Sequence, residues 1–209
     1  MNPKCSRWET CYSFNELTSC RGCSFQHFEN VLNAHKENKD LQFLGDRYFK
    51  LISEKRKGEG GRIALDEPMR ELFINRIPEL ISIPQEKLKV KLFGEDFRIK
   101  ADGAFQADET CIFFELKGVG DDTNSVLSAI VAAQLLKKVP EFNKSFYYYI
   151  GIQSGSKQYP NGLERMSFLD DKRLGIAPYV RWAESNNFLK FYGIVDIQSL
   201  LADIQKQIQ

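Results

Sequence analysis

The chain has 209 residues, enough for one domain with a sizeable core or for a domain with a small appendage. Its composition, 43% hydrophobic and 27% charged, is typical of a soluble globular protein and excludes a collagen-like or disordered chain. No apolar run reaches the roughly 20 residues of a membrane span, so we expect no membrane association. The first residues, Met-Asn-Pro-Lys-Cys, lack the apolar stretch of a secretory signal, which predicts a cytoplasmic protein. The formal net charge of +1 leaves nucleic-acid binding open, because an acidic site can offset a basic groove in the sum.

Cysteine is concentrated at the N-terminus. Four of the five cysteines lie within the first 23 residues: Cys5, Cys11, Cys20 and Cys23. In a reducing compartment such a cluster favours metal binding over disulfides. The two residues between Cys20 and Cys23 include a glycine, and this spacing lets both thiolates converge on one tetrahedral Zn²⁺. We therefore expect a small module built around a structural Zn²⁺, with His27 and His35 as substitute ligands. An iron–sulfur cluster and unligated thiols are the alternatives.

Two polar, glycine-containing stretches are candidates for DNA contact. The first is EKRKGEGGR, residues 54–62, which follows helical patterns over residues 25–34 and 41–55. The second is SGSKQYPNGLERMSF, residues 154–168. Their side chains suit phosphate and base-edge contacts, the alternatives being a solvated linker and a plain surface loop. The candidate DNA-binding residues are Lys55, Arg56, Lys57, Arg62, Lys157, Tyr159, Asn161 and Arg165.

Beyond the first stretch, the pattern predicts an alternation of helices and strands. Acidic residues and a proline at positions 66–68 indicate the start of a helix. Period-two patterns predict strands over residues 87–94, 96–105, 110–117 and 145–153, and an apolar helix over 126–139 separates the last two. The order is α-β-β-β-α-β, followed by a strand and an amphipathic helix over 188–204. We divide the chain into an N-terminal region, residues 1–62, and a domain, residues 63–209.

Charged residues occur near the ends of two of the expected strands, residues 96–105 and 110–117. Because strand side chains alternate between faces, Glu115 and Lys117 share one face of the third strand. With the preceding turn centred on residues 107–108, Asp102 lies opposite Phe113 and diagonal to Glu115. Diagonal neighbours are roughly 7–8 Å apart at Cα, close enough for two carboxylates to share a cation.

Two carboxylates and a lysine on an otherwise buried sheet are costly unless they satisfy one another or a metal. Carboxylate oxygens, with the remaining positions left to water and phosphate, suit Mg²⁺. Such an ion polarises a phosphodiester and lowers the pKa of a bound water, which Lys117 would orient or help to deprotonate. The alternative is an ordinary strand end whose Glu115 and Lys117 reach solvent at the edge of the sheet.

Asp102, followed after twelve residues by Glu115-Leu116-Lys117, resembles the signature of the PD-(D/E)XK nuclease superfamily. The resemblance covers residues 66–153 and implies a restriction-endonuclease-like α/β core, in which a mixed sheet is flanked by helices. It further implies that Asp102 and Glu115 are metal ligands, joined by the carbonyl of Leu116, and that Lys117 is the catalytic lysine. The chain departs from the signature at Ala101, where many members of the superfamily have proline.

Two weaker candidates come from the flanking helices. Some members of the superfamily bring an additional acid from the first helix, where this chain has Glu71. The helical wheel places Glu71 nearly opposite the apolar stripe, which predicts a solvated position. Gln134 interrupts the apolar helix. It lies either near the expected metal site or in the core as a hydrogen-bonded polar group.

The resemblance implies Mg²⁺-dependent hydrolysis of DNA phosphodiester bonds, and we expect a type II restriction endonuclease. A chain of this size suits a homodimer on a short palindrome, because a two-fold protein matches a two-fold site in double-stranded DNA. The alternatives are a repair or recombination nuclease with the same chemistry, and a non-catalytic zinc-containing DNA-binding protein whose acidic cluster is only structural.

Overall fold

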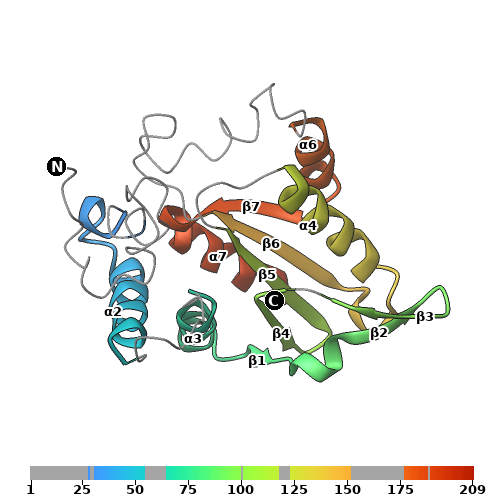
Figure 1. The fold of residues 1–209 in the computed structure, drawn as a ribbon, viewed down its shortest axis with the longest axis horizontal. Helices are drawn as coiled ribbons and strands as arrows, with labels where there is room; N and C mark the ends of the chain where they lie inside the picture. The colour runs from blue at the N-terminus through green and yellow to red at the C-terminus, as the bar shows by residue number, and fades with distance from the viewer. Residues whose placement is uncertain are drawn as a thin grey trace, which may run out of the picture.

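The fold is centred on a five-stranded sheet of strand order β1-β4-β5-β6-β7 (Figure 1). The structure is a computed structural model, and it describes residues 28, 31–54, 65–99, 101–117, 123–151, 177–187 and 189–209. The strands of the sheet are β1 (Ile81–Ser82), β4 (Gly103–Ala107), β5 (Thr110–Lys117), β6 (Ser145–Gly151) and β7 (Leu189–Gly193). The first three strands pair antiparallel, whereas β5, β6 and β7 are parallel. The sheet is therefore mixed, as predicted.

Helices cover both faces of this sheet (Figure 1). On one face lie α2 (Lys39–Glu54), α3 (Asp66–Arg76) and α7 (Ile197–Ile208). On the other lie α4 (Thr123–Leu136) and α6 (Ala177–Ser185), which connect the parallel strands. The prediction of an α/β protein with a mixed sheet flanked by helices is confirmed. None of the helices in the described ranges has the length and apolar character needed to cross a membrane.

Local sequence signals explain where α2 and α3 begin and end. The side chain of Asn38 accepts hydrogen bonds from the backbone N–H groups of Asp40 and Leu41, at 3.1 and 3.2 Å, and so caps the start of α2. Helix α3 begins at Asp66, as predicted, with acidic residues in its first turn, and it ends two residues before Pro78.

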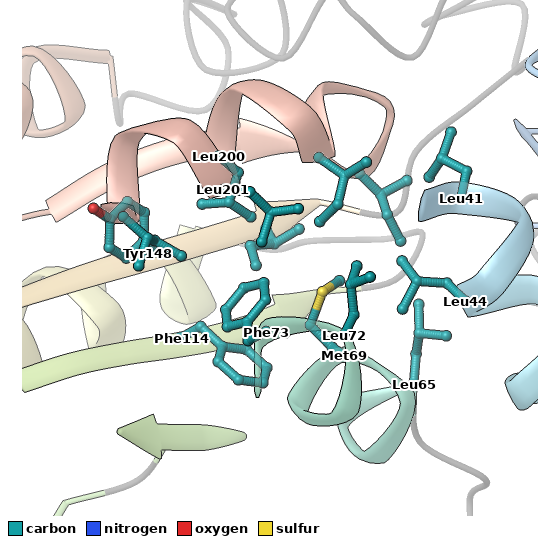
Figure 2. Packing of buried hydrophobic residues seen from close by; sticks show 14 of the residues in the cluster. Leu41, Leu44, Leu65, Met69, Leu72, Phe73, Phe114, Tyr148, Leu200 and Leu201 are labelled. Atoms are coloured by element: carbon teal, nitrogen blue, oxygen red, sulfur yellow. The ribbon is translucent and has the colours of Figure 1, made fainter. Parts of the chain in front are cut away.

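The core beneath α3 and α7 is rich in aromatic and leucine side chains (Figure 2). Phe73 of α3 meets Phe114 of β5 edge-on, with ring centroids 5.2 Å apart. Phe105 of β4 stacks on Phe114 at 6.1 Å. Leu41 and Leu44 of α2 belong to the same cluster, so α2 shares the core of the sheet. The expected boundary at residue 62 falls among residues 55–64, outside the described part of the chain.

The first two predicted strands differ from the observed ones. Residues 85–88 form a short 3₁₀ helix, and β2 (Lys89–Leu92) and β3 (Glu95–Arg98) form a separate two-stranded sheet. The predicted strand over 96–105 is thus broken between β3 and β4, and the first strand of the main sheet is the short β1 instead. The turn at residues 93–94 explains the difference. Its positive φ angles, 54° and 86°, suit a tight two-residue hairpin that pairs β2 with β3 rather than with the main sheet.

Gly103 leaves space that a neighbouring aromatic ring fills. A Cβ atom added at Gly103 would lie 2.0 Å from Cε1 of Phe114, whose ring is held by the packing described above. We therefore expect Gly103→Ala to lower the free energy of unfolding by about 1–3 kcal/mol, as overpacking does. Gly151→Ala is the matched control, because nothing lies within 4 Å of a Cβ added there. Urea unfolding measures both, and equal stabilities of the two variants would contradict this account of the packing.

The buried thiol of Cys111 on β5 predicts a pH effect. Burial raises the pKa of Cys111 from 9.0 to about 11. The thiol of the unfolded chain therefore loses its proton first, and its contribution to stability, complete below about pH 9, is lost as pH rises toward 11. The stability difference between the wild type and Cys111→Ala should shrink over this range by at most about 1.4 kcal/mol per pH unit. A difference that stays constant from pH 8 to 11 would contradict this role for burial.

Candidate active site

The pairing of β4 with β5 brings the two predicted carboxylates together. Gly103 pairs with Phe114, and the backbone N–H of Asp102 donates to the Phe114 carbonyl at 2.9 Å. In a regular antiparallel ladder that N–H would face Glu115, so the bond to Phe114 marks a local irregularity at Asp102, which lies just outside β4. The Asp102 side chain still reaches the end of β5 that carries Glu115, because its Oδ2 accepts a hydrogen bond from the Leu116 N–H and both carboxylates lie near Tyr147.

The observed register differs from the predicted one by two residues. The turn is centred on Asp108 and Glu109 instead of on residues 107–108, and Asp108 has a positive φ of 49°, which aspartate tolerates better than most residues. Asp102 consequently lies just beyond the last pair, Gly103 with Phe114, and not opposite Phe113. Both carboxylates lie near Tyr147, which faces the side of the sheet for which they were predicted.

Each carboxylate accepts a hydrogen bond from a neighbouring group. The backbone N–H of Leu116 donates to Oδ2 of Asp102 at 2.7 Å. The hydroxyl of Tyr147, on β6, donates to Oε2 of Glu115 at 3.1 Å. Both acidic side chains are half-buried. A backbone donor and a side-chain donor thus each hold one oxygen of a half-buried acid at this end of β5.

Leu116 also supplies a backbone oxygen on this side of β5. A strand residue directs its N–H and C=O to the same neighbouring strand. Because the Leu116 N–H reaches Asp102, its carbonyl also faces the β4 side, where Asp102 lies. The donor set is therefore two carboxylates and one carbonyl. Such hard oxygen donors fit Mg²⁺, which is commonly bound by one or two carboxylates and otherwise by water and phosphate. Within the described ranges, no group of three or more His, Cys, Asp or Glu side chains could hold a metal ion.

Tyr147 contacts Glu115, and no local sequence pattern indicates this contact. Its ring is buried, with 1% of its surface exposed. Burial and the nearby charges of Glu115 and Asp102 raise the pKa of Tyr147 well above its usual range, so the hydroxyl stays protonated. Its proximity to Glu115 follows from the parallel pairing of β5 with β6, which joins segments more than thirty residues apart and has no local sequence signal.

The other predicted residues are placed differently. Lys117 is the last residue of β5, paired with Gly151, and its side chain lies outside what the structure describes. Glu71 lies on α3, which covers the opposite face, and it forms an ion pair with Arg47 of α2. It is half-buried and is not brought to the carboxylate pair. Gln134 is half-buried on α4, the helix that covers the face of Asp102 and Glu115.

The expected zinc and DNA-contact residues fall outside the described ranges. The expected zinc ligands are Cys5, Cys11, Cys20 and Cys23. The expected DNA-contact residues are Lys55, Arg56, Lys57, Arg62, Lys157, Tyr159, Asn161 and Arg165. These assignments stay predictions from the sequence.

Comparisons of the chain with protein-family models, with curated proteins and with solved structures find no match. Any assignment of function therefore depends on the geometry of the carboxylate pair and on the sequence signature that surrounds it.

The hydrogen bond from Leu116 predicts how Asp102 variants unfold. Asp102→Ala removes the acceptor and leaves the Leu116 N–H without this bond, which we expect to cost about 1–3 kcal/mol of stability. Asp102→Asn retains a side-chain oxygen that can accept the same bond, so it should lose less. Urea unfolding without divalent metal tests this ranking. An alanine variant as stable as the asparagine variant would show that the bond does not hold Asp102.

Proposed function

We propose that this protein hydrolyses DNA phosphodiester bonds with Mg²⁺ bound between Asp102 and Glu115. The observation that carries the proposal is the pairing of β4 with β5, which brings the two half-buried carboxylates to the same end of β5, next to Tyr147. Carboxylates that converge in this way favour a shared divalent cation, because the cation offsets the repulsion between two partly desolvated negative charges.

The order of the elements supports the same proposal. Helix α3 is followed by β1, β4, β5, α4 and β6, which is the α-β-β-β-α-β order that resembles the PD-(D/E)XK nucleases. Asp102 immediately precedes the second of these strands, β4, and Glu115 lies near the end of the third, β5. The hairpin of β2 and β3 is then an insertion between the first and second strands of this order.

Each residue of the site has a role in the proposed chemistry. Asp102, Glu115 and the carbonyl of Leu116 would hold the ion. A bound Mg²⁺ supplies a Lewis acid that polarises the phosphodiester and lowers the pKa of water. Lys117, which follows on the same strand, would orient the attacking water and offset the negative charge that develops in the transition state. Half-burial limits the water that competes for these groups.

The finer assignment is a cytoplasmic type II restriction endonuclease that acts as a homodimer on double-stranded DNA. Two-fold protein symmetry would match a palindromic site. The basic residues of segments 54–62 and 154–168 would contact phosphates and base edges, and the N-terminal cysteines would hold a structural Zn²⁺. A repair or recombination nuclease would use the same carboxylates but would recognise DNA structure rather than sequence.

One observation favours a second candidate, a non-catalytic zinc-containing DNA-binding protein. The carboxylates of Asp102 and Glu115 already accept hydrogen bonds from Leu116 and Tyr147, as purely structural acids would. Hydrogen-bonded carboxylates are, however, also usual among metal ligands. A cleavage assay separates the two candidates.

Plasmid DNA incubated with the protein and Mg²⁺ should be cleaved, and Glu115→Gln should slow cleavage by more than about 100-fold. The amide is a poor Mg²⁺ ligand, and each 1.36 kcal/mol of lost transition-state stabilisation is about tenfold in rate. Lys117→Ala should have a similar effect. The matched control is Glu109→Gln, which changes an exposed carboxylate in the β4–β5 turn and should leave the rate unchanged.

Wild-type rates in Glu115→Gln and Lys117→Ala would contradict the assignment of the site. DNA binding without cleavage by the wild-type protein would favour the non-catalytic candidate. Among cleaving outcomes, discrete bands indicate sequence-specific restriction, whereas cleavage that follows DNA structure indicates a repair or recombination enzyme.

A further inference from the structure

The hydroxyl of Tyr147 reaches the candidate site from the neighbouring strand. Tyr147 pairs with Phe113 in the parallel register of β5 and β6, two residues before Glu115 on the same face of the sheet. Its side chain extends along the sheet so that the hydroxyl donates to Oε2 of Glu115 at 3.1 Å. A residue of β6 therefore contacts a side chain that we assign to metal binding on β5.

Aromatic packing restrains the Tyr147 ring and therefore its hydroxyl. The ring stacks on Phe113, with centroids 6.3 Å apart and an interplanar angle of 10°. Phe113 in turn meets Phe142 edge-on at 5.4 Å. Tyr147 is 1% exposed, and Phe113 is fully buried. Close-packed rings of this kind occupy one rotamer, so the position of the hydroxyl is set before any ligand arrives.

Glu115 needs such a restraint more than Asp102 does. A glutamate has one more rotatable bond than an aspartate, and fixing it on a cation costs more conformational entropy. Asp102 is held at Oδ2 by the Leu116 N–H, a group of the backbone itself. Hydrogen bonds to ligating side chains commonly set their orientation, and losing such a partner weakens metal binding about 10–100-fold.

We propose that Tyr147 is a positioning residue, whose hydroxyl holds Glu115 in the orientation that lets it share a divalent cation with Asp102. The inference rests on the proposed metal-dependent function and assigns to β6 a part in the site that the signature on β4 and β5 does not contain. Tyr147 does not touch the substrate. It acts through Glu115, and its removal weakens metal binding more than it lowers the rate at saturating metal.

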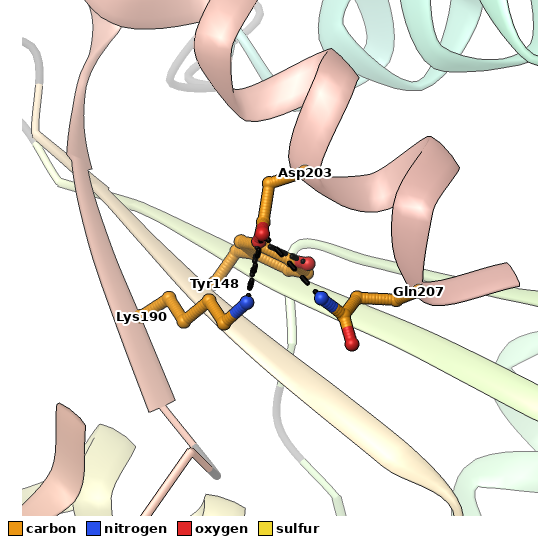
Figure 3. A network of polar contacts seen from close by, with 4 residues as sticks. All are labelled: Tyr148, Lys190, Asp203 and Gln207. Atoms are coloured by element: carbon orange, nitrogen blue, oxygen red, sulfur yellow. Dashed lines mark hydrogen bonds and ion pairs between the residues drawn. The ribbon is translucent and has the colours of Figure 1, made fainter. Parts of the chain in front are cut away.

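The neighbouring Tyr148 provides a matched control (Figure 3). It is equally buried, and its hydroxyl also donates to a carboxylate, Oδ2 of Asp203 on α7, at 2.9 Å. Because adjacent strand residues face opposite sides of the sheet, this bond lies in the core under α7, away from the candidate site. Tyr148→Phe thus removes one buried tyrosine–carboxylate bond from the same strand without touching Glu115.

The test measures the binding of Mn²⁺ alone to the DNA-free protein. The electron paramagnetic resonance signal of free Mn²⁺ reports how much of the ion is unbound. Tyr147→Phe should raise the Mn²⁺ Kd about 10–100-fold, whereas Tyr148→Phe should leave it within about twofold of wild type. In cleavage assays, Tyr147→Phe should need correspondingly more Mg²⁺ for half-maximal rate and should approach the wild-type rate at saturating Mg²⁺. Circular dichroism and urea midpoints establish that both variants are folded.

Each alternative result overturns the inference in a recognisable way. A wild-type Kd in Tyr147→Phe shows that the metal site exists without help from Tyr147. Equal weakening in Tyr147→Phe and Tyr148→Phe shows a general effect of β6 stability. If neither the wild-type protein nor Glu115→Gln binds Mn²⁺, the proposed metal site does not exist. Tyr147 then has no role in metal binding.

Discussion

The antiparallel register of β4 and β5 is the constraint on which the rest of the site depends. It is maintained by Gly103, whose missing side chain leaves room for the ring of Phe114, and by the packing of that ring in the core. A slip of one residue would send Asp102 and Glu115 to opposite faces of the sheet and would also take Phe114 out of its contacts with Phe73 and Phe105. The interactions that bury the aromatic core therefore also bring the two carboxylates to the same end of β5.

The two faces of the sheet accommodate acidic side chains in different ways. Under α7, Asp203 is compensated by Lys190, whose Nζ lies 2.8 Å from both carboxylate oxygens, and by the hydroxyl of Tyr148 (Figure 3). On the α4 face, two carboxylates converge, and neutral donors from the backbone and from β6 hold one oxygen of each. The first arrangement is a structural ion pair with a hydrogen-bonded tyrosine. The second gathers carboxylate oxygens at one end of β5, and in our proposal these oxygens bind a hard divalent cation.

The sequence was informative where the signal is local. The strand over residues 110–117 and the helix that begins at Asp66 were predictable from period-two alternation and from acids at a helix start. The hairpin of β2 and β3 was not, because alternation does not specify which strand is the partner. The register was missed by two residues, since it depends on the left-handed backbone of Asp108. The contact of Tyr147 with Glu115 was missed because it follows from parallel pairing between distant segments.

The most direct test of the account is a crystal structure of the protein grown with Mn²⁺, with anomalous scattering measured at the manganese edge. The account predicts one anomalous peak between the carboxylates of Asp102 and Glu115, with the Leu116 carbonyl among its ligands and the Tyr147 hydroxyl still bonded to Glu115. Mn²⁺ bound elsewhere on the chain, or carboxylates that remain hydrogen-bonded with no peak between them at saturating Mn²⁺, would contradict it.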